Sequence, residues 1–145
     1  MIGLIQRVSR ADVRVDGKTI GEIGRGLLVL VAVHRDDTDH DIARLAERLL
    51  GYRVFPDAEG RMNRSVVDES AGLLLVPQFT LAADTKKGTR ASFTKAAAPD
   101  KGKNYFLRLV EICHGSLDKV ETGSFGADMK VTLTNDGPVT FWIES

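Results

Sequence analysis

The sequence predicts a single α+β domain over residues 1–145, with a mostly antiparallel, barrel-like β-sheet core and two main covering helices. Three observations support this fold class. Apolar segments of strand length outnumber helical ones, two longer segments repeat apolar residues at helical spacing, and turn residues separate neighbouring segments. The 43% hydrophobic and 28% charged residues are typical of globular proteins and argue against a disordered or fibrous chain.

Two turn signals divide the first part of the chain. Asp16-Gly17 is typical of a tight hairpin turn and follows the alternating Val13 and Val15. Gly24-Arg25-Gly26 follows a second alternating segment, so we expect another reversal of the chain there. Two reversals within so short a stretch predict antiparallel pairing.

Two continuous apolar runs predict strands that are covered on both faces. The first is Leu27 to Val33, and the second is Gly72 to Val76, which ends at Pro77. Between Tyr52 and Gly72 the periodicity is weak and turn residues are frequent, so we expect irregular connections with short strands. The two runs therefore form the centre of the expected sheet.

A helix is expected from Asp39 to Leu50. Thr38 is a suitable N-cap residue, and Asp41 places an acidic group near the positive end of the helix dipole. Gly51 is expected to end this helix. The residues on its apolar face are Ile42, Leu45 and Leu49.

A second helix is expected to begin at Pro99-Asp100 and to end just before Gly115. Its apolar face comprises Phe106, Leu109, Val110 and Cys113. Cys113 is the only cysteine, so no disulfide forms within the chain. Because nothing near it in the sequence would stabilise a thiolate, we interpret it as a core thiol.

The last part of the chain contains a further turn signal at Asn135-Asp136-Gly137. Apolar residues alternate on both sides of it, namely Val131, Leu133, Val139, Phe141 and Ile143. This pattern is typical of a hairpin, so we expect a terminal strand pair.

Charge and targeting signals narrow the classes of function. Twenty basic residues balance twenty acidic ones, so the global positive charge of many nucleic-acid-binding proteins is absent and any RNA contact must be local. The segment from Thr85 to Pro99 lacks acidic residues and is either such a contact or a solvated loop; it carries Lys86, Lys87, Arg90 and Lys95. With no signal peptide and no membrane-spanning run, we expect a cytoplasmic protein.

Familiar catalytic signatures are absent from the sequence. It contains no Gly-rich phosphate loop, no Gly-x-Ser-x-Gly elbow and no His-Glu-x-x-His motif. The three histidines, His34, His40 and His114, are scattered, and one cysteine cannot complete a zinc site with them. We therefore expect no metal, no other cofactor and no catalytic histidine.

Two segments are unusual for their expected structure. In Pro77-Gln78-Phe79-Thr80-Leu81, a proline and an amide stand at the end of an apolar strand. An unpaired buried amide costs about 1–3 kcal/mol, so Gln78 needs a hydrogen-bond partner. The second segment is Gly137-Pro138, which on local grounds alone is an ordinary turn.

Together the two segments resemble the paired motifs Ser-Gln-x-x-Leu and Asn-x-Gly-Pro-Val-Thr of the D-aminoacyl-tRNA deacylase family, also called D-tyrosyl-tRNA deacylases. The second motif is matched at Asn135, Gly137, Pro138, Val139 and Thr140. The similarity continues in Leu4 to Val8, Gly21 to Leu28, Thr80 to Asp84 and Ala127 to Met129, and thus covers essentially the whole chain. Pro77 is a departure, because the family usually has serine there.

The resemblance implies a symmetric homodimer that hydrolyses the ester bond of D-aminoacyl-tRNA. In the family, the Gly-Pro peptide bond is cis and enters the active site of the partner subunit, where its backbone rejects L-amino acids. The implied catalytic residues are Gln78, Phe79 and Thr80, and the implied substrate-binding residues are Pro77, Met129, Gly137 and Pro138. The implied partner is aminoacyl-tRNA, held at its 3′ terminal adenosine.

The resemblance also implies a mechanism in which the ribose 2′-OH of the substrate assists the attack. Backbone N–H groups near Phe79 would stabilise the oxyanion. An alternative is a Thr80 nucleophile, for which the sequence offers no activating base. Glycine has no side chain to reject, so glycine mischarged on tRNA-Ala is an implied second substrate. A non-catalytic module that binds aminoacyl-tRNA is the alternative from another class.

Overall fold

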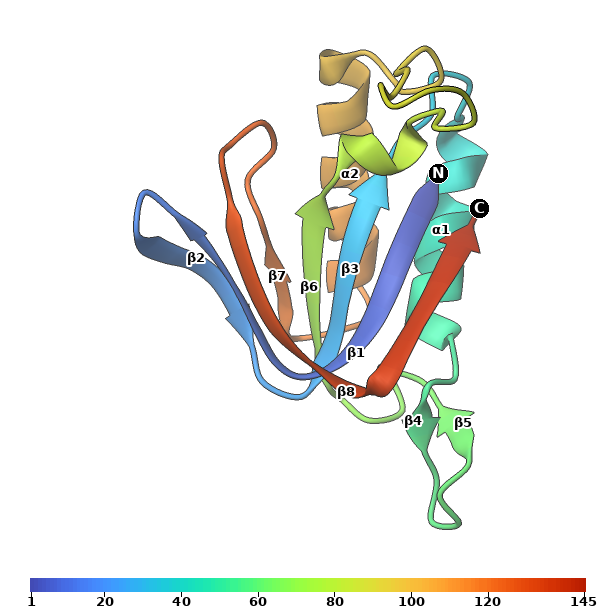
Figure 1. Cartoon of the computed structure of the whole chain (residues 1–145). Helices are drawn as coiled ribbons and strands as arrows, with labels where there is room; N and C mark the ends of the chain where they lie inside the picture. The colour runs from blue at the N-terminus through green and yellow to red at the C-terminus, as the bar shows by residue number, and fades with distance from the viewer.

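The computed structural model describes residues 1–145 and has two α-helices beside a strongly curved sheet (Figure 1). The expected α+β class with a mostly antiparallel, barrel-like sheet is confirmed. In chain order the elements are β1 (Ile2–Val15), β2 (Lys18–Ile23), β3 (Gly26–Ala32), α1 (Asp39–Gly51), β4 (Phe55–Pro56), β5 (Met62–Arg64), β6 (Gly72–Pro77), the 3-10 helix η1 (Phe79–Ala82), α2 (Pro99–His114), β7 (Val120–Thr122) and β8 (Lys130–Glu144).

Strand β1 organises the sheet because β2, β3 and β8 all pair with it in antiparallel fashion. Strand β3 pairs with its first half and β2 with its second half, so the two lie one after the other along the same edge of β1. Strand β8 pairs along almost the whole of β1. Strands β6 and β7 continue the sheet beyond β3 in parallel pairing.

The expected reversal at Gly24-Arg25-Gly26 is wrong, because β2 and β3 run in the same direction. The glycine at position 26 serves a close approach of two backbones instead. A Cβ on Gly26 would lie 2.0 Å from the carbonyl oxygen of Gly72, at the point where β3 and β6 begin to pair. The Asp16-Gly17 hairpin is confirmed, with positive φ angles of 50° and 76°.

The sheet separates the two larger apolar clusters. On its inner, curved side β2 contacts β6 and β7, which brings the sheet close to a barrel. The inner cluster consists of Val8, Ala11, Val13, Ile23, Leu28, Leu74 and Val76. On the other side, α1 and α2 pack against each other and over the sheet, where the buried helix residues include Ile42, Leu45, Leu49, Phe106, Leu109 and Cys113. Both expected helices are thus confirmed with their apolar faces.

Helix ends follow the sequence signals closely. The Thr38 N–H and hydroxyl both donate to the Asp41 carboxylate at 2.8 Å, and these bonds hold the pKa of Asp41 well below its usual value. Helix α1 includes Gly51, one residue more than expected. In α2, burial raises the pKa of the Cys113 thiol to about 12, in agreement with a core thiol.

The expected terminal strand pair is wrong, because Lys130–Glu144 forms one strand. Both halves of β8 pair with β1, and the chain does not turn back at Asn135-Asp136-Gly137. Apolar residues alternate on both sides of this segment because a bulge, rather than a hairpin turn, interrupts the strand there. Between Tyr52 and Gly72, the expected irregular connections with short strands are confirmed by β4 and β5. Neither α-helix is long and apolar enough to cross a membrane.

Candidate active site

A cavity of about 500 Å³ opens at the end of β6. Its walls come from that strand end, from the first residue of η1, from the start of α2, and from the connection between β7 and β8. The predicted site residues that line it are Pro77, Gln78, Phe79 and Met129. Folding therefore gathers four of the seven predicted residues around one cavity, although Met129 is far from the others in the sequence.

Pro77 and Gln78 end the central strand without leaving a strand hydrogen bond unmade. Pro77 is the last residue of β6, and the next N–H, of Gln78, donates to the Val31 carbonyl of β3 at 2.7 Å. The missing N–H of Pro77 is thus not needed by β3, as expected for a proline at a strand end. The Gln78 side chain also has its partner, because its Nε2 donates to Thr80 Oγ1 at 2.5 Å.

Phe79 and Thr80 open the short helix η1. The first N–H groups of a helix have no acceptor within it, so those of Phe79 and Thr80 are available to a ligand. The Phe79 side chain is 57% exposed and packs against Phe93, with ring centroids 5.1 Å apart. Thr80 is exposed but does not line the cavity; it reaches the site through its bond to Gln78.

The cavity is largely apolar and has little charge of its own. Seven of its twelve lining residues are hydrophobic, among them Phe125 and Val131. Asp128 is the only ionisable side chain in the lining, and Lys130 Nζ donates to its two oxygens at 2.9 and 3.1 Å. The site therefore offers an apolar wall and backbone donors rather than a side-chain base.

Gly137 and Pro138 do not line the cavity but belong to a bulge in β8. Asn135 pairs with Val8 and Thr140 pairs with Gln6, so residues 136–139, the β8 bulge, face only Arg7 on β1. Both Gly137 and Pro138 are exposed, and the peptide bond between them is cis.

Backbone conformation makes glycine the only fitting residue at position 137. Its φ angle is +147°, which L side chains rarely adopt. A Cβ there would lie 2.7 Å from Val139 Cγ2 and 2.8 Å from Val139 N. The shape of the β8 bulge therefore depends on the absence of a side chain.

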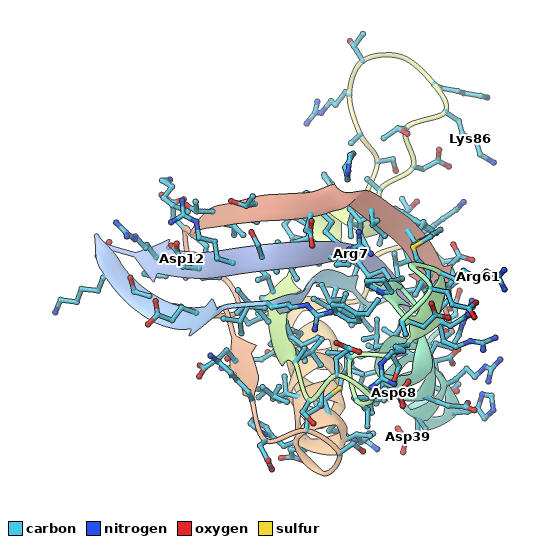
Figure 2. All side chains as sticks on the ribbon, turned by 90° about the horizontal axis from the view of Figure 1, so that it is seen from below. Arg7, Asp12, Asp39, Arg61, Asp68 and Lys86 are labelled. Carbon is cyan, nitrogen blue, oxygen red and sulfur yellow. The ribbon has the colours of Figure 1, made fainter.

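Two side chains hold the β8 bulge in place. The Asn135 Oδ1 accepts from the Val139 N–H at 2.7 Å, and its Nδ2 donates to Thr140 Oγ1 at 2.8 Å, so this side chain spans the bulge. From β1, Arg7 Nε donates to the Asp136 carbonyl at 2.8 Å and Nη1 to the Val54 carbonyl at 2.6 Å. Figure 2 shows Arg7 beside the bend of β8.

Sequence analysis assigned no role to Arg7, Phe93 or Phe125. Arg7 is one of three arginines in β1, and its low exposure of 14%, which only the folded chain reveals, distinguishes it from Arg14 at 57%. Phe93, Phe125 and Pro99 come from loops and a helix start whose positions only the folded chain defines.

Comparison with known proteins adds to this geometry. Residues 4–144 match the family model described as D-Tyr-tRNA(Tyr) deacylase. The chain belongs to this family. The resemblance seen in the two motifs is thereby confirmed, and the cavity and the β8 bulge are where the chain carries those motifs.

Relatives of this deacylase family cover the full length of the chain. A D-aminoacyl-tRNA deacylase of Alkalilimnicola ehrlichii is 62% identical over 145 residues, covering 100% of this chain and 97% of that protein. One of Thioalkalivibrio sulfidiphilus is 60% identical over 144 residues, covering 99% and 97%. Among solved structures, a c-Myc DNA Unwinding Element Binding Protein superposes with a TM-score of 0.96 at 35% identity, covering 100% and 99%.

Proposed function

We propose that this protein hydrolyses the ester bond of D-aminoacyl-tRNA and releases free tRNA and the D-amino acid. The observation that supports this best is the meeting of Pro77, Gln78, Phe79 and Met129 at one apolar cavity in a chain of the D-Tyr-tRNA(Tyr) deacylase family. An aminoacylated terminal adenosine has both a flat aromatic base and a reactive ester, and the cavity provides an apolar wall next to backbone donors. Because aminoacyl-tRNA occurs in the cytoplasm, we propose the cytoplasm as the location of this protein.

The activity is tested by comparing release of D- and L-tyrosine from charged tRNA. We expect rapid release of the D-isomer and slow release of the L-isomer, since the proposed site selects by excluding L side chains. Equal rates would overturn the chiral selection. Binding of D-tyrosyl-tRNA without single-turnover hydrolysis would instead favour the non-catalytic binding module.

In the proposed mechanism, the N–H groups at the start of η1 stabilise the oxyanion, and the ribose 2′-OH beside the ester assists the attacking water. The alternative nucleophile, Thr80, has a poor environment for activation. Its hydroxyl oxygen accepts from the Gln78 amide at 2.5 Å, and no base accepts its proton. Gln78 thus positions Thr80 and the start of η1.

The two mechanisms predict opposite results for two changes. With tRNA ending in 2′-deoxyadenosine, the substrate-assisted route predicts a large loss of rate, whereas a Thr80 nucleophile predicts little loss. With Thr80→Ala, the predictions are reversed: a complete loss would support the nucleophile. Thr80→Ser, which keeps the hydroxyl, is the matched control.

We further propose that the protein acts as a homodimer in which Gly137-Pro138 of one subunit enters the cavity of the other. The β8 bulge is exposed, β8 pairs with β1 on one edge only, and Phe141 and Trp142 on this strand are 36% and 50% exposed. An unpaired strand edge with exposed aromatic residues is suited to pairing with a second copy.

Mixed subunits test whether the site is shared. Gly137→Ala impairs the bulge and Phe79→Ala impairs the cavity, so each homodimer should have a strongly lowered kcat/KM. After random exchange of subunits, half of the dimers are heterodimers. Each heterodimer has one intact site out of two, so about a quarter of the wild-type activity should return. No recovery after verified subunit exchange would contradict a shared site.

A backbone wall that rejects L side chains cannot reject glycine, which has none. We therefore propose glycine mischarged on tRNA-Ala as a second substrate. Hydrolysis of Gly-tRNA-Ala at a rate no greater than that of L-alanyl-tRNA-Ala would overturn this extension.

A further inference from the structure

The connection between η1 and α2 concentrates positive charge in a chain whose net charge is zero. We call residues 85–95 the basic loop. Lys86, Lys87 and Arg90 are all exposed there, and there is no acidic residue from Thr85 to Pro99. Figure 2 shows Lys86 on a loop that stands away from the body of the protein.

Backbone hydrogen bonds fix the base of the basic loop. Asp84 and Ser92 bond to each other in both directions, at 2.7 and 3.0 Å, and this pair closes the loop. Farther along, the Arg35 N–H donates to the Lys95 carbonyl at 2.9 Å, which ties the loop to the segment after β3. The three cations are therefore presented from a defined position rather than from a free tail.

None of Lys86, Lys87 and Arg90 forms an ion pair within the chain. The nearest acid in the chain, Asp84, is occupied: it accepts from the Lys86 N–H at 3.0 Å and lies 3.7 Å from Lys95 Nζ. Both contacts hold the pKa of Asp84 below its usual value, so it remains ionised as the partner of Lys95.

The basic loop also forms part of the rim of the cavity. Its Phe93 packs on Phe79, with ring centroids 5.1 Å apart, and Phe79 lines the cavity. Ala97 and Pro99, which follow the loop directly, line the cavity as well. A ligand that extends out of the cavity on this side would pass the three unpaired cations.

We infer that the basic loop binds phosphates of the RNA strand immediately before the terminal adenosine, through Lys86, Lys87 and Arg90. This inference rests on the proposed function, which places the aminoacylated adenosine in the cavity. The preceding nucleotides must then leave across the rim, where unpaired cations match their charge. Such contacts carry no sequence information, so they suit an enzyme that accepts more than one tRNA.

Binding of uncharged tRNA as a function of KCl concentration tests the inference. Each phosphate contact to a single strand contributes about 0.7 to the slope of log K against log salt. The variant Lys86→Ala/Lys87→Ala/Arg90→Ala should therefore show a slope about 2 units shallower than wild type and weaker binding at low salt. Equal slopes for the two proteins would overturn the inference.

The matched control removes three exposed cations from other elements: Lys18→Ala/Arg61→Ala/Lys119→Ala. It has the same change in net charge, and it should keep the wild-type slope. If the salt-dependence slope becomes shallower by the same amount in both triple variants, binding depends on net charge alone and the inference fails. The charge-preserving Lys86→Arg/Lys87→Arg variant should bind like wild type.

Failure of the inference can be told apart from failure of the proposed function. Release of D-tyrosine from tRNA by the wild-type protein reports on the function alone. For that same protein, kcat/KM should fall steeply with salt for D-tyrosyl-tRNA but not for 3′-O-D-tyrosyl-adenosine, which has no phosphate. Equal salt dependence for the two substrates would overturn the basic-loop contact while leaving the deacylase intact.

Discussion

The cavity at the end of β6 and the β8 bulge are built in opposite ways. The cavity is concave, and its walls come from segments far apart in the sequence. The β8 bulge is exposed, consists of consecutive residues, and is held by Asn135 within the strand and by Arg7 from β1. Sequence motifs thus mark both regions, but only the bulge is built from consecutive residues.

The two regions also lie apart in one chain. Arg7, beside the bulge, pairs with Leu27 near the start of β3, whereas Gln78, at the cavity, bonds to Val31 near its end. At ~3.3 Å per residue, four residues of strand alone separate them by ~13 Å. A protruding element and a distant hollow in the same chain are the arrangement that two copies can bring together, and this supports the proposed shared site.

The largest effect is expected from altering the bulge at Gly137. Gly137→Ala should lower kcat/KM for D-tyrosyl-tRNA by about 100-fold or more, because the φ of +147° and the contact with Val139 force the backbone to move. The matched control is Gly60→Ala, which also has a positive φ, of 80°, but no atom within 4 Å of the new Cβ. Comparable losses in both variants would show that general strain, not the bulge, is responsible.

A smaller effect is expected from Arg7. Arg7→Met removes the hydrogen bonds to the carbonyls of Asp136 and Val54, each a bond from a charged donor worth about 1.5–3 kcal/mol. We expect roughly 10-fold lower kcat/KM with a reduced preference for the D-isomer, measured on both charged tRNAs. Arg14→Met, on the same strand, should keep the preference. An unchanged D/L ratio in Arg7→Met would mean that Arg7 does not position the bulge.

The cavity responds differently, through binding rather than selection. Phe79→Leu should raise KM for D-tyrosyl-tRNA roughly 5-fold with kcat and the D/L ratio little changed, because an aromatic contact with a base is worth about 1–3 kcal/mol. The control is Ile112→Ala, another exposed apolar residue, on α2, that lies outside the cavity lining. A loss confined to kcat would show that the Phe79 side chain acts in the chemical step.

The smallest effect on activity is expected at Cys113, which lies in the core between the helices and the sheet and bears on stability instead. Its pKa is raised to about 12 by burial, so the folded protein keeps the thiol protonated while the unfolded chain ionises near its ordinary value. The contribution of the Cys113 thiol to the free energy of unfolding is therefore complete below about pH 8.5 and is lost as pH rises toward 12. The free energies of unfolding of wild type and Cys113→Ala, measured with urea, should converge as pH rises over this range. If the two free energies stayed parallel across the range, the buried, protonated state of the thiol would be contradicted.

Local patterns were sufficient for the helices and for the strand cores. Thr38 with Asp41 and Pro99 with Gly115 mark helix ends because caps and dipoles act within one turn. The same local reasoning was wrong at Gly24-Arg25-Gly26 and at Asn135-Asp136-Gly137. Glycine there serves a close approach to Gly72 and a bulge opposite Arg7, and both depend on a partner strand.

The sequence by itself determined the fold class, the family and the two motif segments, because hydrophobic periodicity and motif residues are properties of consecutive positions. Tertiary structure alone decided that Met129 joins Gln78 and Phe79 at one cavity, that Arg7 holds the β8 bulge, and that Gly137 lies away from that cavity. The physical reason is that strand pairing and packing act between residues far apart along the chain, and no local pattern specifies which of them meet.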